Sequence, residues 1–357
     1  MTIRASILLA LAACGDDTTV PPDAISMAPD AAGAYVPGAA LSISHGDPGN
    51  DEDPALLRAS DGSIYVAWYS QHAGDDILIS KTTDGAGWSV PTRVTSDPTT
   101  NFGPTLYQDA AGTFHAAWFR WTTAPPGKII YSHSADGLTW SAADEVEVTR
   151  AAATDDWVPS INETPAGELV IAFARNTCPP PNTCYAIDIA RSTTRGAAWE
   201  APIAVVSAGS GLEHHLPALA RIGNELVLAW DPFNDTANAP WESATTGSYV
   251  RVMRSTTGTT WTAASDVTTP QPTSITLYPT FYADHAGAWH VGYLAGDQAA
   301  TAVVEVPLAA PATTPAVLPL PGYSPRIVAT PTAGVYLGAY VAGAVNEREV
   351  YVKVFSH

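Results

Sequence analysis

The stretch Ser134–Trp140, "SADGLTW", decides how this chain folds, because related stretches occur three more times. The other copies are "TTDGAGW" (Thr82–Trp88), "STTGTTW" (Ser255–Trp261) and "STTRGAAW" (Ser192–Trp199), which is one residue longer. Asp, Ser and Thr side chains accept hydrogen bonds from backbone N–H groups in turns, and Gly supplies a positive φ. The Trp would bury a large apolar surface and hold the turn against a sheet. Four copies of one turn indicate an internal repeat.

A second pattern accompanies the turn. Six runs rich in β-branched and aromatic residues read as strands, and they end at Trp68, Trp118, Phe173, Trp230, Tyr293 and Tyr340. A proline precedes each run and is expected to open an inner strand: Pro54, Pro104, Pro159, Pro217, Pro279 and Pro325. These prolines are 50, 55, 58, 62 and 46 residues apart, which is the spacing of one repeated four-stranded unit.

Six such units predict an all-β chain folded as a six-bladed β-propeller with four-stranded antiparallel blades. The third strand of a blade would end at the Ser or Thr of the turn, and the fourth would leave from the Trp. The last unit stops early, at "EVYVKVFSH", so "AALSISHG" ahead of Pro54 is expected to supply its outer strand and close the ring. No window shows the sustained 3.6-residue period of helices.

The repeated turn resembles the Asp-box, or BNR repeat, of sialidase-type propellers, and the resemblance covers roughly residues 40–357. In that family the turn is structural and lies away from the active face. The opposite face collects the loops that enter the inner strands and those that join the second and third strands. The resemblance therefore implies a site at that end of the central channel.

The N-terminus reads as a targeting segment. Arg4 is followed by an apolar run too short to span a bilayer, as in a signal peptide. "LAAC", Leu11–Cys14, resembles the lipobox of bacterial lipoproteins, which implies lipidation of Cys14 and a place on the outer membrane or cell surface. The domains would be a signal peptide over 1–13, a disordered tether over 14–39 and the propeller over 40–357. The alternative is an ordinary signal peptide with a chance cysteine.

The net charge and the cysteine content limit the ligands and partners that the protein can have. The net charge of −19 over 357 residues argues against nucleic acid and against anionic membrane surfaces. In an exported chain, Cys178 and Cys184 of "CPPPNTC" are expected to form a disulfide, and no second Cys/His pair has metal-site spacing. We expect no cofactor and no metal. Calcium is the alternative at an acidic cluster that lacks the spacing of known calcium loops: Asp47, Asp51, Glu52 and Asp53.

The resemblance to sialidases also implies catalytic residues. Tyr323, followed by Ser324, stands where the family has its tyrosine nucleophile, and Glu213 stands where the family has the carboxylate that draws the phenol proton. Asp75 or Asp76 is placed like the family's acid/base, which protonates the leaving oxygen. The structural alternative is that the tyrosine packs the channel and the acids are solvated loop residues.

The same face carries further ligand-binding candidates. Glu52 and Asp231 stand where sialidases have two of their three carboxylate-binding arginines, so sialic acid itself is disfavoured. The arginines at this face could bind an anion or pair with nearby acids, and the tryptophans suit sugar stacking. His214 and His215 should point to opposite sides of an extended segment, which argues against one shared metal. The candidates are Arg120, Arg175, Trp121, Trp157, Asp231 and His214.

Two functions follow from these residues, beside a third possibility, a purely structural surface protein. The first is a surface-anchored, monomeric, sialidase-like lipoprotein that recognises a glycan at the channel mouth and hydrolyses a glycosidic bond. The second is a non-catalytic propeller that binds glycan or protein at the same face. The lipid anchor would be the protein's link to the membrane in either case.

Overall fold

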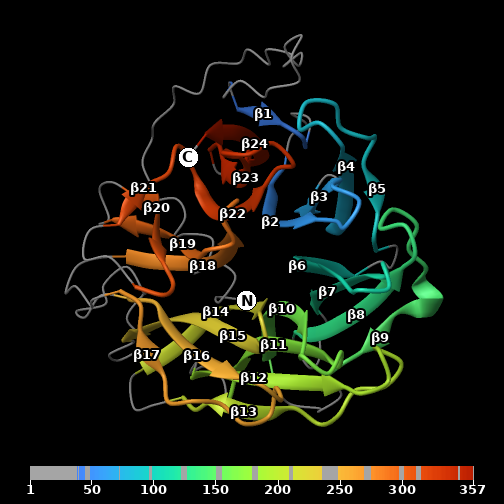
Figure 1. The fold of residues 1–357 in the computed structure, drawn as a ribbon. Coiled ribbons are helices and arrows are strands. Elements are labelled where there is room, and N and C mark those ends of the chain that lie inside the picture. Colours follow the sequence, from blue (N-terminus) through green and yellow to red (C-terminus); the bar gives the residue numbers. More distant parts are fainter. Residues whose placement is uncertain are drawn as a thin grey trace.

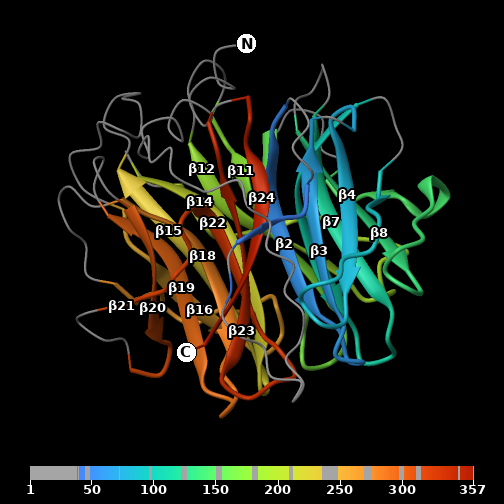
Figure 2. The same cartoon turned by 90° about the horizontal axis from the view of Figure 1, so that it is seen from above.

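Six four-stranded antiparallel sheets stand around a common axis (Figure 1). The computed structural model describes residues 38, 40–44, 49–71, 73–95, 99–121, 127–149, 155–178, 184–208, 212–234, 248–268, 275–296, 301–310, 315–344 and 346–356. Figure 2 shows the blades from the side, with their strands running between the two faces of the ring. The six-bladed, all-β propeller expected from the repeat is confirmed.

The blades follow one another along the chain, and each begins with its inner strand. Blade one contains β2 (Asp51–Arg58), β3 (Ile64–Ser70), β4 (Asp76–Thr82) and β5 (Thr92–Arg93), and blade two contains β6 (Thr100–Gln108), β7 (Phe114–Trp121), β8 (Lys128–Ser134) and β9 (Val146–Glu147). Blade three contains β10 (Asp155–Glu163), β11 (Leu169–Asn176), β12 (Tyr185–Ser192) and β13 (Ile203–Val206), and blade four contains β14 (Leu212–Ile222), β15 (Glu225–Asn234), β16 (Arg251–Ser255) and β17 (Ser265–Asp266). Blade five contains β18 (Ile275–Ala283), β19 (Trp289–Gly296), β20 (Thr301–Pro307) and β21 (Ala316–Val317), and blade six contains β22 (Tyr323–Ala329), β23 (Val335–Ala342) and β24 (Glu349–Ser356). The described helical content is one 3₁₀ turn, Ala142–Asp144. No helix in this part of the chain is long and apolar enough to cross a membrane.

The N-terminal strand closes the ring, as the sequence predicts. β1 (Leu41–Ser42) forms the outer strand of the sixth blade and pairs antiparallel with β24. Leu41 lies opposite Val352, and Ser42 lies opposite Tyr351. The sixth blade is therefore assembled from both ends of the described chain, and blade one becomes the direct neighbour of blade six.

The prolines and the aromatic residues of the repeat lie opposite each other at a bulge in the inner strand. Each proline lies inside its inner strand, two to five residues after the strand begins, so the expectation that proline opens the strand is wrong. At each proline the strand register shifts by one residue, as in a β-bulge. In blade one, Asp53 and Pro54 together oppose Trp68. In every blade the opposing residue is the fully buried aromatic: Trp68, Trp118, Phe173, Trp230, Tyr293 and Tyr340.

The residue before each proline adopts a positive φ. These φ values run from 44° to 57°. A left-handed conformation costs on the order of 1–2 kcal/mol for a residue with a side chain, and it is a genuine outlier for the β-branched Val158. The surrounding pairing holds each bulge in place, and all six residues line the central channel: Asp53, Gly103, Val158, Leu216, Tyr278 and Ser324.

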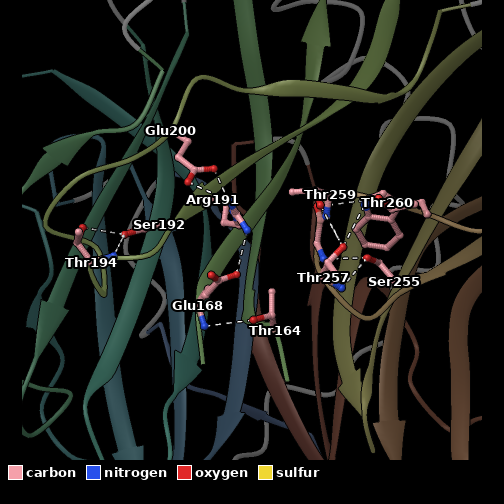
Figure 3. Close-up of polar contacts among 12 residues, drawn as sticks. Thr164, Glu168, Arg191, Ser192, Thr194, Glu200, Ser255, Thr257, Thr259 and Thr260 are labelled. Atoms are coloured by element: carbon pink, nitrogen blue, oxygen red, sulfur yellow. Dashed lines mark hydrogen bonds and ion pairs between the residues drawn. The ribbon is translucent and has the colours of Figure 1, made fainter. Parts of the chain in front are cut away.

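The repeated turns have the hydrogen bonds that their side chains suggest. Asp136 Oδ1 accepts from the backbone N–H groups of Leu138 at 2.9 Å and Thr139 at 2.7 Å. Desolvation opposes the shift, but these bonds outweigh it and lower the pKa of Asp136 to about 2. In the fourth blade Thr257 Oγ1 takes the place of the carboxylate and accepts from Thr260 N at 3.2 Å (Figure 3).

The longer turn of the third blade is held in another way. Thr194 Oγ1 accepts from Ala198 N at 2.8 Å, and Ser192 Oγ accepts from Gly196 N at 2.8 Å. Figure 3 also shows Arg191, on the strand that enters this turn, between Glu168 and Glu200. The turn therefore accommodates its extra residue without losing its side-chain bonds to the backbone.

The hydrophobic core lies between the blades. Trp88, Trp140, Trp199 and Trp261 each pack into the interface between their own blade and the preceding one. The four residues thus occupy equivalent positions, as predicted. Because the blades bury their faces against one another, the channel end of each inner strand is left to carry polar groups.

Candidate functional site

The channel mouth is the face where the inner strands begin, the second strands end and the third strands begin. Two groups of ionisable side chains lie at this face. One belongs to blades six and one, and the other to blades three and four, on the opposite side of the axis (Figure 1). Beneath the mouth, the inner strands of all six blades enclose a cavity of about 220 Å³.

Tyr323 lies in the first group and is buried beside Arg348 and Glu52, which the sequence did not predict to be its neighbours. Arg348, which directly precedes β24, donates from Nη1 to Glu52 Oε1 at 2.7 Å, and its guanidinium lies 5.8 Å from the centre of the Tyr323 ring. Burial raises the pKa of Tyr323 well above its usual value, and Glu52 adds to the shift while Arg348 opposes it. Tyr323 is therefore a neutral phenol, and its hydroxyl makes no hydrogen bond among the described residues.

Glu213 lies in the other group. Its Oε2 is 3.1 Å from Nε2 of His215, whose ring packs edge-on against Tyr185 at 4.4 Å between centroids. Blade five, with β18, stands between the β14 of Glu213 and the β22 of Tyr323. The structure thus places the two predicted partners at one face without joining the phenol to Glu213. The carboxylates that act on Tyr323 are Glu52 and, more weakly, Asp53.

Asp75 and Asp76 serve as links within and between blades. Asp75 accepts from the Tyr69 hydroxyl at 2.6 Å and from Thr100 Oγ1 of the second blade at 3.1 Å. Asp76 is buried, forms an ion pair with Arg93 of the outer strand and accepts from a threonine hydroxyl at 2.9 Å. Neither is among the described residues that line the cavity.

The two predicted arginines are paired within their own blades. Arg120 donates to Asn101 Oδ1 at 3.1 Å and to Glu145 at 2.6 Å. Arg175 holds Asp156 through Nε at 2.7 Å and through Nη2 at 3.2 Å, and its Nη1 bonds Asp188 at 2.8 Å. These contacts match the structural alternative stated for both arginines, that they pair with nearby acids.

His214 and Asp231 are also buried. Nδ1 of His214 accepts the indole N–H of Trp230 at 3.1 Å, as Asn101 accepts that of Trp118 at 2.9 Å at the equivalent place in blade two. Burial lowers the pKa of His214 to about 4, and the positive charge of neighbouring groups adds to the shift. Asp231 is fully buried, and burial raises its pKa well above the usual range.

Asp155 and Tyr185 are members of the second group that the sequence did not single out. Asp155 is the first residue of β10, and its Oδ1 has no hydrogen-bond partner in the described part of the chain. Burial raises the pKa of Asp155 to about 6; the Trp157 indole opposes the shift and Asp156 adds to it. Asp155 and Glu213 both act on Tyr185, whose pKa is raised chiefly by burial. Two carboxyl groups from adjacent blades therefore act on one phenol.

Aromatic side chains lie between the second and third blades at this face. Trp121 and Trp157 meet edge to face, with 5.5 Å between ring centroids, and Trp157 also packs on Phe119 at 4.8 Å. Trp157 and Trp121 are partly exposed. Because Trp157 is two residues from Asp155, an apolar ring surface adjoins the carboxyl group.

The disulfide predicted between Cys178 and Cys184 is present, with 5.2 Å between the Cα atoms. Asn176 Oδ1 accepts from both cysteine N–H groups, at 3.1 and 3.0 Å. The disulfide and these two hydrogen bonds lie directly before Tyr185. Asp47, a member of the acidic cluster considered for calcium, lies outside the described residues. Cys14, the predicted site of lipidation, also lies outside them. Among the described residues no group of His, Cys, Asp or Glu is arranged to hold a metal ion.

Comparison with known proteins identifies relatives of the fold. No protein-family model matches the chain, and no curated protein matches its sequence. Among solved structures, a protein of unknown function from Dyadobacter fermentans is 14% identical, with a TM-score of 0.68, over 90% of this chain and 98% of that chain. An α-L-arabinofuranosidase of Fusarium graminearum, bound to an iminosugar inhibitor, is 14% identical with a TM-score of 0.64, over 89% and 98%. An α-L-arabinanase of Penicillium chrysogenum, bound to arabinobiose, is 12% identical with a TM-score of 0.62, over 89% and 99%.

At these identities the likeness shows the fold and not the activity. The similar solved structures include an arabinofuranosidase and an arabinanase, which are enzymes that act on glycans. Their likeness extends over most of this chain.

Proposed function

We propose that this protein is a glycoside hydrolase that binds a glycan at the channel mouth and cleaves it with Asp155 and Glu213. The observation that carries the proposal is the pair of buried carboxyl groups on adjacent blades, both acting on Tyr185. The pKa of Asp155, raised to about 6, lets this residue hold a proton near neutral pH. A pair of carboxyl groups is what glycoside hydrolysis requires.

The two carboxyl groups would have different roles. Asp155 is the candidate general acid, because a carboxylic acid with a raised pKa can protonate the leaving oxygen. Glu213, with the His215 imidazole at 3.1 Å, is the candidate base or nucleophile. Trp157 and Trp121 offer ring surfaces for a sugar beside the acid.

Tyr323 fits packing of the channel better than nucleophilic attack. Burial and a nearby carboxylate both disfavour the phenolate, and the hydroxyl is buried with the ring in the core between the blades. The role of Tyr323 as nucleophile, implied by the resemblance to sialidases, is therefore replaced in this proposal. The sialidase-like relationship itself rests on the repeated turns and on the ring they build.

Activity on a panel of glycosides tests the proposal. Because the similar structures include an arabinofuranosidase and an arabinanase, the panel should include 4-nitrophenyl α-L-arabinofuranoside and arabinobiose beside other aryl glycosides. On a substrate that is turned over, Glu213→Gln should lower kcat roughly 10²-fold or more. Asp155→Asn should lower it by a similar factor for the disaccharide and much less for the nitrophenyl glycoside, whose leaving group needs no proton.

Matched controls are two acids that form ion pairs within the fourth blade: Asp266 on the outer strand β17, and Glu225 at the start of β15, at the face opposite the mouth. Asp266→Asn and Glu225→Gln should leave the rates unchanged. Equal rates for the wild type and both mouth variants would refute the assignment of the carboxyl pair.

A second candidate function is a propeller that binds glycan without cleaving it. The pairing of Arg120, Arg175, Asp75 and Asp76 within the ring favours this reading, because it leaves fewer side chains for chemistry. Saturable binding of an oligosaccharide, with no product after long incubation, would establish the binder in place of the enzyme.

We also propose that the protein is anchored through a lipid on Cys14, on the support of the lipobox-like "LAAC" behind an apolar run. Cys14→Ala should move the protein from the membrane fraction to the soluble fraction. Retention of the variant in membranes would contradict the anchor.

A further inference from the structure

The cavity beneath the mouth has a wall of mixed polarity, and its most polar side carries charged groups. Its volume of about 220 Å³ equals roughly seven waters at liquid density. The apolar part includes Leu56, Leu106, Leu216 and Phe281. The polar side is formed where blades six and one meet.

Arg326 supplies the charge on the polar side. It follows Pro325 in β22 and lines the cavity. Among the described residues its guanidinium makes one hydrogen bond, from Nη1 to the carbonyl oxygen of Pro325 at 2.8 Å. A guanidinium has five N–H donors, so four remain for another acceptor. Burial lowers the pKa of Arg326, and Asp53 and Tyr278 act in the opposite direction.

Ser324 adds a second donor beside the arginine. Its side chain is fully buried, the residue is among those that line the same cavity, and its backbone has a positive φ of 51° at the bulge. The hydroxyl has no hydrogen-bond partner among the described residues. A buried hydroxyl without a partner is uncommon in native proteins and calls for an explanation.

We propose that this cavity is a binding site for a small monocarboxylate, held through its carboxylate by the guanidinium of Arg326 and the hydroxyl of Ser324, with its apolar body against the channel wall. The planar fork of arginine matches the two oxygens of a carboxylate. The apolar part of the wall suits a short hydrocarbon body. Asp53 and Glu52 would repel a second negative charge, which excludes a dianion.

The charged groups around the site make the binding depend on pH. Asp53 lies near Arg326, and burial, with the charge of Glu52, raises the pKa of Asp53 to about 7 against the opposing effect of Arg326 and Arg348. Below that pH Asp53 is neutral and Arg326 lacks a counter-charge, so a carboxylate should bind more tightly at pH 6 than at pH 8. The other ionisable groups here are the phenols of Tyr278 and Tyr323 and, deeper in the cavity, that of Tyr107.

This site is separate from the carboxyl pair proposed for hydrolysis. Asp155 and Glu213 belong to blades three and four, and neither is among the described residues that line the cavity. A measurement of ligand binding to the cavity is therefore independent of the measurement of glycoside hydrolysis.

Calorimetric titration of the full chain with sodium butyrate tests the inference, with butanol as the neutral analogue. Wild-type protein should bind butyrate saturably and butanol much more weakly. Arg326→Met should weaken butyrate binding roughly tenfold or more. Arg254→Met, which removes an arginine of the outer part of blade four, should leave the affinity unchanged.

A second variant guards against misfolding. If circular dichroism shows that Arg326→Met is unfolded, Ser324→Ala decides the question, and it should weaken butyrate binding several-fold. Absence of butyrate binding to the wild type, or full affinity in the folded variants, would overturn the proposal. Asp155→Asn should keep the affinity for butyrate even if it abolishes hydrolysis, so failure of one proposal is distinguishable from failure of the other.

Discussion

Replacing His214 with asparagine should make the stability of the protein less dependent on pH. Nδ1 of His214 accepts the indole N–H of Trp230 at 3.1 Å, so the folded protein needs the neutral imidazole. An asparagine oxygen already accepts the equivalent N–H in blade two, where Asn101 bonds Trp118 at 2.9 Å. His214→Asn therefore keeps an acceptor for Trp230 and removes the group that titrates.

The magnitude follows from the two pKa values of His214. The imidazole has a pKa of 6.5 in the unfolded chain and of about 4 in the folded protein, chiefly because of burial and then because of the nearby His215 and Arg251 charges. A folded pKa below the unfolded one means that protons bind the unfolded chain more readily. The contribution of His214 is therefore fully present above pH 6.5 and is lost as the pH falls through 4, a change of about 3 kcal/mol.

Urea denaturation at several pH values measures the effect. Near pH 7 the variant should lie within about 1 kcal/mol of the wild type, because one hydrogen bond replaces another. Towards pH 4 the wild type should lose about 3 kcal/mol more than His214→Asn. The exposed His133, changed to asparagine, controls for the loss of a histidine as such. Parallel stability curves for wild type and His214→Asn over this pH range would refute the reasoning.

Three further predictions concern the turns and the closure of the ring. Gly196→Ala should destabilise the protein by more than about 2 kcal/mol in thermal or urea unfolding, because a Cβ there would overlap the Tyr131 ring at a φ of +92°. Adding Tyr131→Leu to the Gly196→Ala variant should recover part of that loss. Asp136→Ala should lower the free energy of unfolding by about 1–2 kcal/mol, because the carboxylate that accepts from two backbone N–H groups is lost, whereas Asp144→Ala, outside the turn, should have little effect. Removal of residues 1–44 deletes β1 and should increase hydrogen exchange first in β24, the strand it covers; unchanged exchange there would contradict the closure.

Most of the fold could be predicted from the sequence because the repeat carries it. Pro54 and Trp68 mark the inner and second strands of blade one, and Trp88 marks the turn to the outer strand. The sequence did not show that the proline and the aromatic residue meet at one bulge, because strand register across a bulge depends on backbone pairing. The sequence pattern alone therefore predicts the proline at the start of the strand and not within it.

The candidate site was less predictable, since proximity across a ring depends on which blades are neighbours. Tyr323 and Glu52 each stand two residues before the proline of their blade, and ring closure makes these two blades adjacent. That shared offset was the signal for their pairing. Glu213 stands four residues before its proline and two blades away, so it meets other partners. Arg348 and Tyr185 reach the mouth from later strands, and no motif marks them.

The bulge in each inner strand separates two kinds of position that can change independently during evolution or design. The buried aromatic opposite the bulge maintains the packing of the blade, while the residue before the proline faces the channel. At that second position the six blades carry Asp, Gly, Val, Leu, Tyr and Ser, with the proline retained throughout. A library that varies these six codons alone would alter the size, polarity and charge of the channel interior on an unchanged scaffold, so the ring offers a route to new ligand preferences that leaves the interfaces between blades intact.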